Sequence, residues 1–264
     1  IDWANILRDA GARVITGIAG LKVHSKLCII TRREKGNKIY YGCIGTGNLH
    51  EKTARIYTDT MLLTCNQIIT KEARQIFTFF DKNYSVPKLQ KLLVAPFNLR
   101  SKINTLINRE IKHAKAGKKA EVFLKLNNLV DEEMIQKLYQ ASKAGVKVRL
   151  IIRGICSLIP NLPGLSENIQ AISIVDKFLE HNRVFMFHNL GKPEIYIGSA
   201  DLMTRNLDFR VEIATPILDE KIQKQLLHIL DLQWRDNVKA RIFNETQNNL
   251  FKKQTTAIAI RSQD

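Results

Sequence analysis

The chain has 264 residues, 45% of them hydrophobic, which is enough for one large domain or two ordinary ones. Its 41 Lys and Arg against 25 Asp and Glu give a net charge of +16, which favours a polyanionic partner: nucleic acid, an anionic membrane face or a phosphate-rich substrate. No apolar run is long enough to cross a bilayer, and four scattered cysteines without C-x-x-C spacing argue against a disulfide framework or a zinc site. We therefore expect buried free thiols in a reducing cytoplasm.

The first segment, "IDWANILRDAG", places Trp3, Ile6 and Leu7 on one helical stripe that ends at Gly11. The following "ARVITG" (12–17) is β-rich and predicts a strand. An open parallel sheet would need another strand ahead of this helix. The sequence therefore suggests a fragment of a longer protein.

The next segment, "LKVHSKLCII" (21–30), is expected to form a strand that carries Lys22, His24 and Lys26 on one face. A second strand, "IYYGCIGTGN" (39–48), ends in a turn of small residues. A helix is expected near 67–81, and "YSVPKLQKLLVAPF" (84–97) is predicted to link two halves.

The second half begins with the amphipathic segment 98–117, followed by a strand in "AEVFLKLN" (120–127). Asp131 is expected to cap the next helix, with Met134 and Leu138 on its inner face. A strand then ends at Arg153. The Pro- and Gly-containing segment 156–168 reads as a loop or lid, and the polar tail after Asn244 carries no pattern.

The two halves repeat the same features in the same order. "VHSKLCII" (23–30) is matched by "EHNRVFMF" (180–187), and "IYYGCIGTGN" (39–48) by "EIYIGSAD" (194–201). An acidic residue follows 14 positions after Gly45 and after Gly198. We therefore expect an α/β fold of two tandem domains related by pseudo-two-fold duplication, over residues 1–90 and 91–264, with the first domain truncated at its N-terminus.

The duplication singles out two histidines, His24 and His181. One can act as a nucleophile through a ring nitrogen while the other protonates or positions the leaving oxygen. Asp59 and Glu212 are placed to hold the second ring nitrogen of each, and Asp59 is the acid expected to orient His24. Four further histidines lie outside the repeat and are expected to be structural: His50, His113, His188 and His228.

Basic and aromatic residues around these motifs predict a phosphate-binding lining. Lys26 and Arg183 lie two positions after the histidines, and Arg153 ends a strand where ligands approach open sheets. The residues that follow the two small turns complete the lining: Arg55, Tyr57, Arg205 and Arg210. Such a site suits phosphoryl transfer, which depends on positioning and on charge stabilisation.

The duplicated H-x-K and G-[TS]-x-[ND] motifs resemble those of the phospholipase D superfamily. The longer strings, among them "GLKVHSKLCIITRRE", "GTGNLHEKTARIYTDTMLLT", "LIIRGICSLIPNLPGLSENI" and "SADLMTRNLDFRVEIATPI", resemble the bacterial histidine-dependent polyphosphate kinase family over nearly the whole chain. The resemblance implies the two C-terminal catalytic domains, each with a phospholipase D-like fold. It also implies reversible transfer of the γ-phosphate of ATP to the end of a polyphosphate chain, through a phosphohistidine and with Mg²⁺.

By motif, the resemblance implies that His24 is the phosphorylated residue and that His181 contacts the phosphates. Tyr57 and Arg153 match nucleotide-phosphate contacts, and Arg210 matches a further phosphate contact. The family's N-terminal and helical domains are absent. Those parts hold the adenine, shape the oligomer and supply the metal ligands, which are therefore expected upstream of residue 1 and not in this chain.

Two alternatives stay open. A phospholipase D-like phosphodiesterase or nuclease would use the same two histidines, although no Asp follows soon after either H-x-[KR] motif. A non-catalytic basic module would bind nucleic acid with a steep salt dependence and would not need His24. The kinase hypothesis predicts ATP or ADP and polyphosphate as partners, and no nucleic acid. It also predicts a homo-oligomer in the full-length protein and a cytoplasmic location, with peripheral association at the inner membrane as an option.

Overall fold

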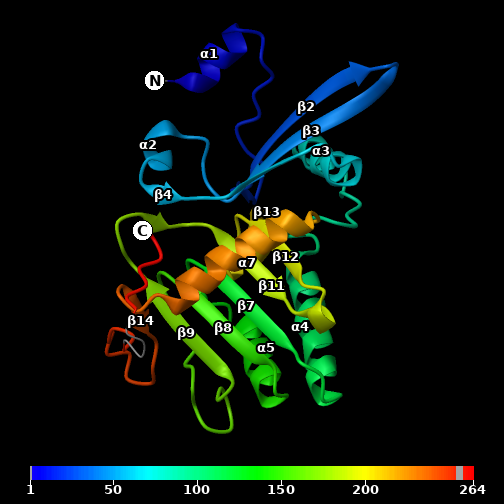
Figure 1. Cartoon of the computed structure of the whole chain (residues 1–264). Coiled ribbons are helices and arrows are strands. Elements are labelled where there is room, and N and C mark those ends of the chain that lie inside the picture. Colours follow the sequence, from blue (N-terminus) through cyan, green and yellow to red (C-terminus); the bar gives the residue numbers. More distant parts are fainter. Residues whose placement is uncertain (1, 254–257) are drawn as a thin grey trace.

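A computed structural model describes residues 2–253 and 258–264 (Figure 1). The first half contains the elements α1 (Trp3–Asp9), β1 (Lys22–Val23), β2 (Lys26–Glu34), β3 (Asn37–Gly45), α2 (Glu51–Ala54), β4 (Tyr57–Thr58), β5 (Met61–Thr64) and α3 (Gln67–Asp81). The strands β2, β3 and β5 form an antiparallel sheet. The predicted helix near 67–81 is confirmed, with Asn66 as its N-cap.

The second half is a larger α/β unit. Its elements are β6 (Leu93–Ala95), α4 (Leu99–Lys115), β7 (Glu121–Leu126), α5 (Glu132–Lys143), β8 (Lys147–Ile152), β9 (Ile169–Ile174), β10 (Leu179–Glu180), β11 (Arg183–Phe187), a 3-10 turn (Asn189–Gly191), β12 (Glu194–Gly198), α6 (Thr204–Asp208), β13 (Arg210–Pro216), α7 (Glu220–Arg235) and β14 (Ala240–Ile242). Its main sheet has nine strands in the order β1-β13-β12-β11-β7-β8-β9-β14, with β6 added to β13. The expected α/β class is confirmed.

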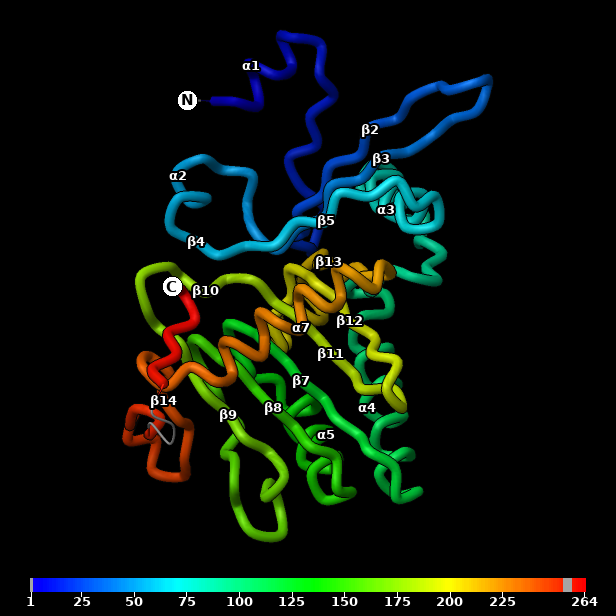
Figure 2. Tube along the Cα trace, in the orientation of Figure 1, coloured from blue at the N-terminus to red at the C-terminus, as the bar shows by residue number. Residues whose placement is uncertain are grey.

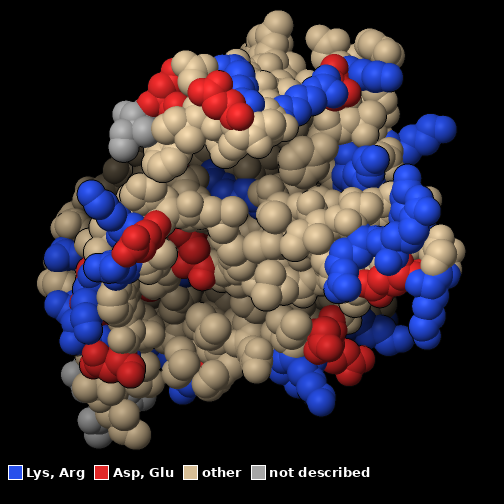
Figure 3. Space-filling view, turned by 90° about the horizontal axis from the view of Figure 1, so that it is seen from above, with Lys and Arg blue, Asp and Glu red and all other residues tan. Residues whose placement is uncertain are grey.

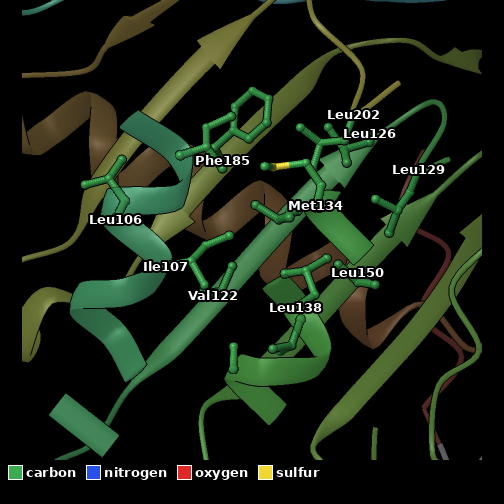
Figure 4. Close-up of a cluster of buried hydrophobic side chains, with 14 of the residues drawn as sticks. Leu106, Ile107, Val122, Leu126, Leu129, Met134, Leu138, Leu150, Phe185 and Leu202 are labelled. Atoms are coloured by element: carbon green, nitrogen blue, oxygen red, sulfur yellow. The ribbon is translucent and has the colours of Figure 1, made fainter. Parts of the chain in front are cut away.

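Helices cover both faces of the large sheet. The helices α4 and α5 pack on one face, where Ile107, Met134 and Leu138 meet Val122 and Leu150 (Figure 4). The helix α7 lies across the other face (Figure 1). Burying each such Leu or Ile stabilises the fold by about 1.5–3 kcal/mol. The predicted Asp131 cap forms here, because its side chain accepts the amide of Met134 at 3.1 Å.

The sheet of the first half is covered on one face only. Ile44 packs with Ile69 and Ile76 of α3, whereas Ile30 and Leu63 are exposed on the opposite face. All four cysteines are free, as expected, but none is buried: Cys28 and Cys65 are exposed, and Cys43 and Cys156 are half-buried. The expectation of buried thiols is wrong. Cys28, Cys43 and Cys65 lie with the exposed Ile30 and Leu63 on the uncovered face of the small sheet.

The helix predicted at the start of the chain forms, but its apolar stripe is exposed, with Trp3 at 64%. The strand predicted at 12–17 does not form; the segment has only an isolated bridge beyond its end, between Ile18 and Leu21. In the second half the corresponding strand, β8, lies between β7 and β9. Among the described residues no strand pairs with 12–17, so its β-rich sequence has no ladder to join.

One connection differs from the prediction and one agrees with it. The expected linker at 84–97 contains β6, a buried strand that pairs Val94 with Ile213 of β13. The segment 156–168 is a loop, as predicted, and leads to the start of β9, where Ile169 pairs with Val148. Ser166 is buried in this loop and donates to the carbonyl of Ile159 at 2.7 Å.

The two halves are joined by two short parallel strand pairs. The strand β1 of the first half pairs with β13 of the second, with Lys22 opposite Arg210. The strand β4 of the first half pairs with β10 of the second, with Tyr57 opposite Leu179. Figure 2 shows β4 beside the yellow-green β10 and the golden β13 next to β5 of the first half. No described helix is long and apolar enough to span a membrane.

Candidate active site

His24 lies at the break between β1 and β2, against β13 of the other half. The amides of His24 and Ser25 both donate to the carbonyl of Val211, at 3.0 and 2.9 Å. These bonds interrupt the strand that the sequence predicts to be continuous. They place the imidazole beside the next residue of β13, where Nδ1 of His24 lies 2.9 Å from Oε2 of Glu212.

His181 lies at the equivalent break between β10 and β11. Its amide and that of Asn182 donate to the carbonyl of Thr58, at 3.2 and 3.0 Å. Nδ1 of His181 lies 2.8 Å from Oδ1 of Asp59, the residue after Thr58. The hydrogen bonds around the two histidines are therefore the same, as the duplication predicts.

The histidine–acid pairs cross between the halves. Asp59 was expected to orient His24, but it contacts His181, and Glu212 of the second half contacts His24. The reason is the strand pairing: β1 lies against β13 and β4 against β10, so each acid faces the histidine of the other half. Each pair is complete only when both halves are assembled.

A hydroxyl from each small turn holds the acid. Thr46 donates to Oδ1 of Asp59 at 2.6 Å, and Ser199 donates to Oε2 of Glu212. Asn206 adds a bond to Oε1 of Glu212 at 2.6 Å. These three residues were not predicted from the sequence. The Thr or Ser shared by the two G-[TS]-[GA]-[ND] turns could have indicated Thr46 and Ser199, whereas no repeated motif marks Asn206.

The acids differ in burial. Glu212 is fully buried, whereas the Asp59 side chain is 22% exposed. Burial raises the pKa of Asp59, but hydrogen bonds from His181 and Thr46 outweigh burial and hold this pKa below its ordinary value. Asp59 is therefore a carboxylate near neutral pH, and a carboxylate at Nδ1 favours the tautomer with its proton on that nitrogen.

The basic residues two positions after the histidines also occupy equivalent places. Lys26 donates to the carbonyl of His24, and Arg183 donates to the carbonyl of His181 at 2.8 Å. Arg183 also contacts two side chains. Its Nε lies 3.2 Å from Oδ1 of Asp201, and its Nη1 lies 3.1 Å from Nε2 of His181.

This arginine makes the two imidazoles chemically unequal. With Nδ1–H directed at a carboxylate, Nε2 carries the lone pair. In His181 this lone pair faces the Arg183 guanidinium. For Nε2 of His24 no hydrogen bond is found within residues 2–253 and 258–264. The two Nε2 atoms therefore differ, because that of His181 accepts from Arg183.

Charges from both halves converge on Lys26. Burial lowers the pKa of Lys26 to about 8; Glu212 and Asp59 oppose this change, whereas Arg183 and Arg210 add to it. Both acids and both arginines therefore act on one ammonium group. The sequence-predicted residues Lys26, Arg210, Asp59 and Glu212 are brought together at the junction of the halves.

Tyr57 and Arg153 lie on the His181 side of this junction. The rings of Tyr57 and His181 are 5.0 Å apart. Nε of Arg153 donates to Oδ1 of Asn127 and to the carbonyl of Glu180, both at 2.9 Å. Tyr57 and Arg153 line the same pocket of about 270 Å³. Seen from above, the molecule has a hollow with Lys or Arg atoms at its floor (Figure 3).

Two other predicted lining residues are exposed. Arg55 follows α2 and is 75% exposed, and it pairs with Glu51 on the surface. Arg205 is exposed on α6. His50 and His188, expected to be structural, accept backbone amides at the starts of short helical turns.

Comparison with known proteins identifies the relatives of this chain. The family model "Polyphosphate kinase C-terminal domain 1" matches residues 1–86, and "Polyphosphate kinase C-terminal domain 2" matches residues 92–263. Polyphosphate kinases of Vibrio vulnificus (strain CMCP6) and Escherichia coli (strain K12) are 49% and 46% identical over 263 residues, which is 100% of this chain and 38% of each relative.

A solved structure agrees with these matches. The crystal structure of polyphosphate kinase from Porphyromonas gingivalis superimposes with a TM-score of 0.92 at 40% identity, over 98% of this chain and 40% of that chain. The matches agree with the α/β fold of two successive catalytic-family domains along the chain. The chain belongs to the polyphosphate kinase family, and it spans 38% of the length of the relatives named above.

Proposed function

We propose that this chain is the phosphate-transfer core of an enzyme that moves the γ-phosphate of ATP to the end of a polyphosphate chain, through a phosphohistidine at His24. One observation carries the assignment. His24 has Nδ1 held by buried Glu212 and Nε2 without a hydrogen bond in the described part of the chain, whereas Nε2 of His181 faces Arg183. Family membership supports the substrate class.

The first step is attack by the Nε2 lone pair of His24 on the γ-phosphorus. The bond from this phosphorus to the bridging oxygen breaks, and ADP leaves with the electron pair. The ring then carries a positive charge with its proton still on Nδ1, and the Glu212 carboxylate balances that charge. In the second step a terminal polyphosphate oxygen attacks the phosphorus, and the phosphorus–nitrogen bond breaks.

The second histidine and the arginines have a positioning role. We assign His181, which is fixed by Asp59 and Arg183, to the positioning of the phosphate groups. Tyr57 lies beside its ring and Arg153 donates to the carbonyl of Glu180, whereas Arg210 acts on Lys26. Guanidinium groups bind phosphate oxygens through paired N–H donors. Lys26 adds a cation beside His24.

Mg²⁺ is expected to accompany ATP, where it neutralises phosphate charge. The described residues contain no cluster of three or more His, Cys, Asp or Glu that could hold a metal ion. No step above therefore depends on a metal ligand of this chain. The homo-oligomer, the cytoplasmic location and the membrane association remain predictions from the sequence.

The test is to incubate the full-length protein with γ-labelled ATP and Mg²⁺. The wild type should acquire an acid-labile, base-stable label, and His24→Ala should acquire none. His50→Ala, which removes a helix-capping histidine outside the site, is the matched control and should keep the label. Absence of label in the wild type, or its survival in His24→Ala, would reject the proposal. Cleavage of a phosphodiester without ATP would instead favour the phosphodiesterase alternative.

A further inference from the structure

The last described segment of the chain attaches to the strand that leads to His181. Arg261 forms a two-point contact with Asp176, with Nε–Oδ2 at 2.8 Å and Nη2–Oδ1 at 2.7 Å. Ser262 donates its amide and its hydroxyl to Oδ2 of Asp236, both at 2.8 Å. We call Arg261, Ser262 and Gln263 the C-terminal clip. The red C-terminal end lies beside β10 in Figure 2.

Gln263 makes the closest approach to the histidine. Its side-chain amide pairs with the backbone of Phe178, accepting from the amide at 2.7 Å and donating to the carbonyl at 2.9 Å. The same nitrogen donates to Oε1 of Glu180 at 2.6 Å. Glu180 immediately precedes His181, so the clip ends one residue from the site.

Glu180 is the centre of a buried network. It is 3% exposed and forms an ion pair with Lys125, which is 2% exposed. Its Oε2 also accepts from Gln233 of α7 at 2.8 Å and from Thr58 of the first half at 3.1 Å. A buried ion pair is stable only when its remaining hydrogen-bonding positions are filled, and Gln263 fills one of them.

The two halves differ in how firmly the strand before each histidine is held. The strand β1, before His24, belongs to the nine-stranded sheet. Within residues 2–253 and 258–264, the strand β10, before His181, pairs only with β4 in a sheet of two strands, each two residues long. A strand pair this short has only marginal stability by itself. The position of His181 therefore depends on contacts from outside the ladder.

We propose that the C-terminal clip is a positioning element for His181: it fixes β10 against β4 and so sets His181 on Asp59 and next to Tyr57 and Arg153. The claim that this matters for phosphate transfer rests on the proposed function. The structural claim does not, because the clip contacts Phe178 and Glu180 whatever the reaction is.

The segment that the clip holds also forms one wall of the pocket that contains Tyr57 and Arg153. Asp176, Phe178 and Glu180 line this pocket. Loss of the clip should therefore weaken ATP use at the site, while the core clusters around α4, α5 and α7 keep their packing. The clip positions catalytic groups and does not itself touch the reacting atoms.

The test is a charge swap across the ion pair in the full-length protein. Arg261→Asp and Asp176→Arg each place like charges in contact, and each should lower kcat/KM for ATP about tenfold. The double variant restores opposite charges and should recover activity to within about threefold of wild type. Gln263→Ala, which introduces no repulsion, should lower kcat/KM about threefold.

Amide hydrogen exchange provides a readout that is independent of catalysis. The amides of Leu179, His181 and Asn182 bond to the first half and should exchange faster in each single variant, with recovery in the double variant. Arg235→Ala is the matched control, because it removes an exposed arginine–carboxylate pair with Asp231 on the adjacent helix. It should change neither exchange nor activity.

The outcomes separate the two proposals. If the wild type forms no phosphohistidine, the proposed function is rejected. If the single variants nevertheless show faster amide exchange at residues 179–182, the role of the clip in fixing β10 is retained. Unchanged exchange and unchanged kcat/KM in both single variants would overturn the clip. A double variant that stays as impaired as the singles would also overturn it, because the loss would then not arise from this ion pair.

Discussion

The two histidines share one backbone arrangement but have different electrostatic surroundings. Two amides donate to one carbonyl at each histidine, and a carboxylate from the opposite half meets each Nδ1. Beyond that the halves diverge. Arg183 is fixed by Asp201 and reaches Nε2 of its histidine, whereas Lys26 is a buried amine whose pKa is lowered.

The difference shows how a duplicated scaffold can produce two roles. The position equivalent to Asp201 in the first half is Asn48, which carries no charge. The first half therefore has neither the arginine nor the acid that fixes it. Nε2 of His24 has no hydrogen-bond partner among the described residues, whereas Nε2 of His181 accepts from Arg183. The difference between the two histidines follows from two differences between the repeats: Lys26 stands where the second half has Arg183, and Asn48 stands where it has Asp201.

The largest expected effect is at the acid that serves the nucleophile. Glu212→Gln removes the buried charge that fixes the His24 tautomer and balances the charged ring. The rate of His24 phosphorylation should fall by about 10²–10⁴-fold. Quench-flow measurement with γ-labelled ATP would detect this, with circular dichroism to confirm folding. A fall of less than threefold would contradict the role given to Glu212.

A medium effect is expected from pH at Lys26. The ammonium is charged below its pKa of about 8 and neutral above it, so its attraction for phosphate is present at pH 7 and lost as the pH rises through 8. KM for ATP should therefore rise about three- to tenfold between pH 7 and pH 9. Lys26→Arg should remove this rise, since arginine stays charged.

The matched control for this pH prediction is Lys22→Arg, at an exposed position on the adjoining strand. It should leave the pH dependence of KM as in the wild type. A rise in KM that persists in Lys26→Arg would assign the titration to another group.

The smallest effect is expected at Arg55, which the sequence analysis placed in the lining. The side chain is 75% exposed and pairs with Glu51 on the surface. Arg55→Ala should change KM for ATP by less than about twofold, because exposed ion pairs contribute little. Steady-state kinetics should compare Arg55→Ala with Arg153→Ala. The Arg153→Ala variant should raise KM for ATP at least tenfold. Equal effects at the two arginines would contradict the geometry.

The sequence was sufficient to predict several local elements and to single out the histidines and acids of the candidate site. Repetition of H-x-[KR] and of an acid at one spacing singled out His24, His181, Asp59 and Glu212 without any contact information. Asp131 marked its helix because capping is a local interaction. These features depend on neighbours in the chain, which a sequence displays.

The crossed pairing could not be predicted, because it depends on which strands meet between the halves. Nothing near Asp59 in the chain indicates that β4 pairs with β10. The clip was missed for the same reason: Gln263 lies in a polar tail and acquires its role only from Phe178 and Glu180. The segment 12–17 shows the reverse case, a β-rich sequence without a partner strand.

The crossed pairs can be tested most directly by the imidazole Nδ1–H resonances of ¹⁵N-histidine-labelled full-length protein, assigned with His24→Gln and His181→Gln. Carboxylate-bound Nδ1 protons are expected at low field for both residues. Glu212→Gln should shift or remove the His24 signal and leave that of His181, whereas Asp59→Asn should affect His181 and leave His24. The reverse pattern, with Asp59→Asn removing the His24 signal, would contradict the crossed arrangement.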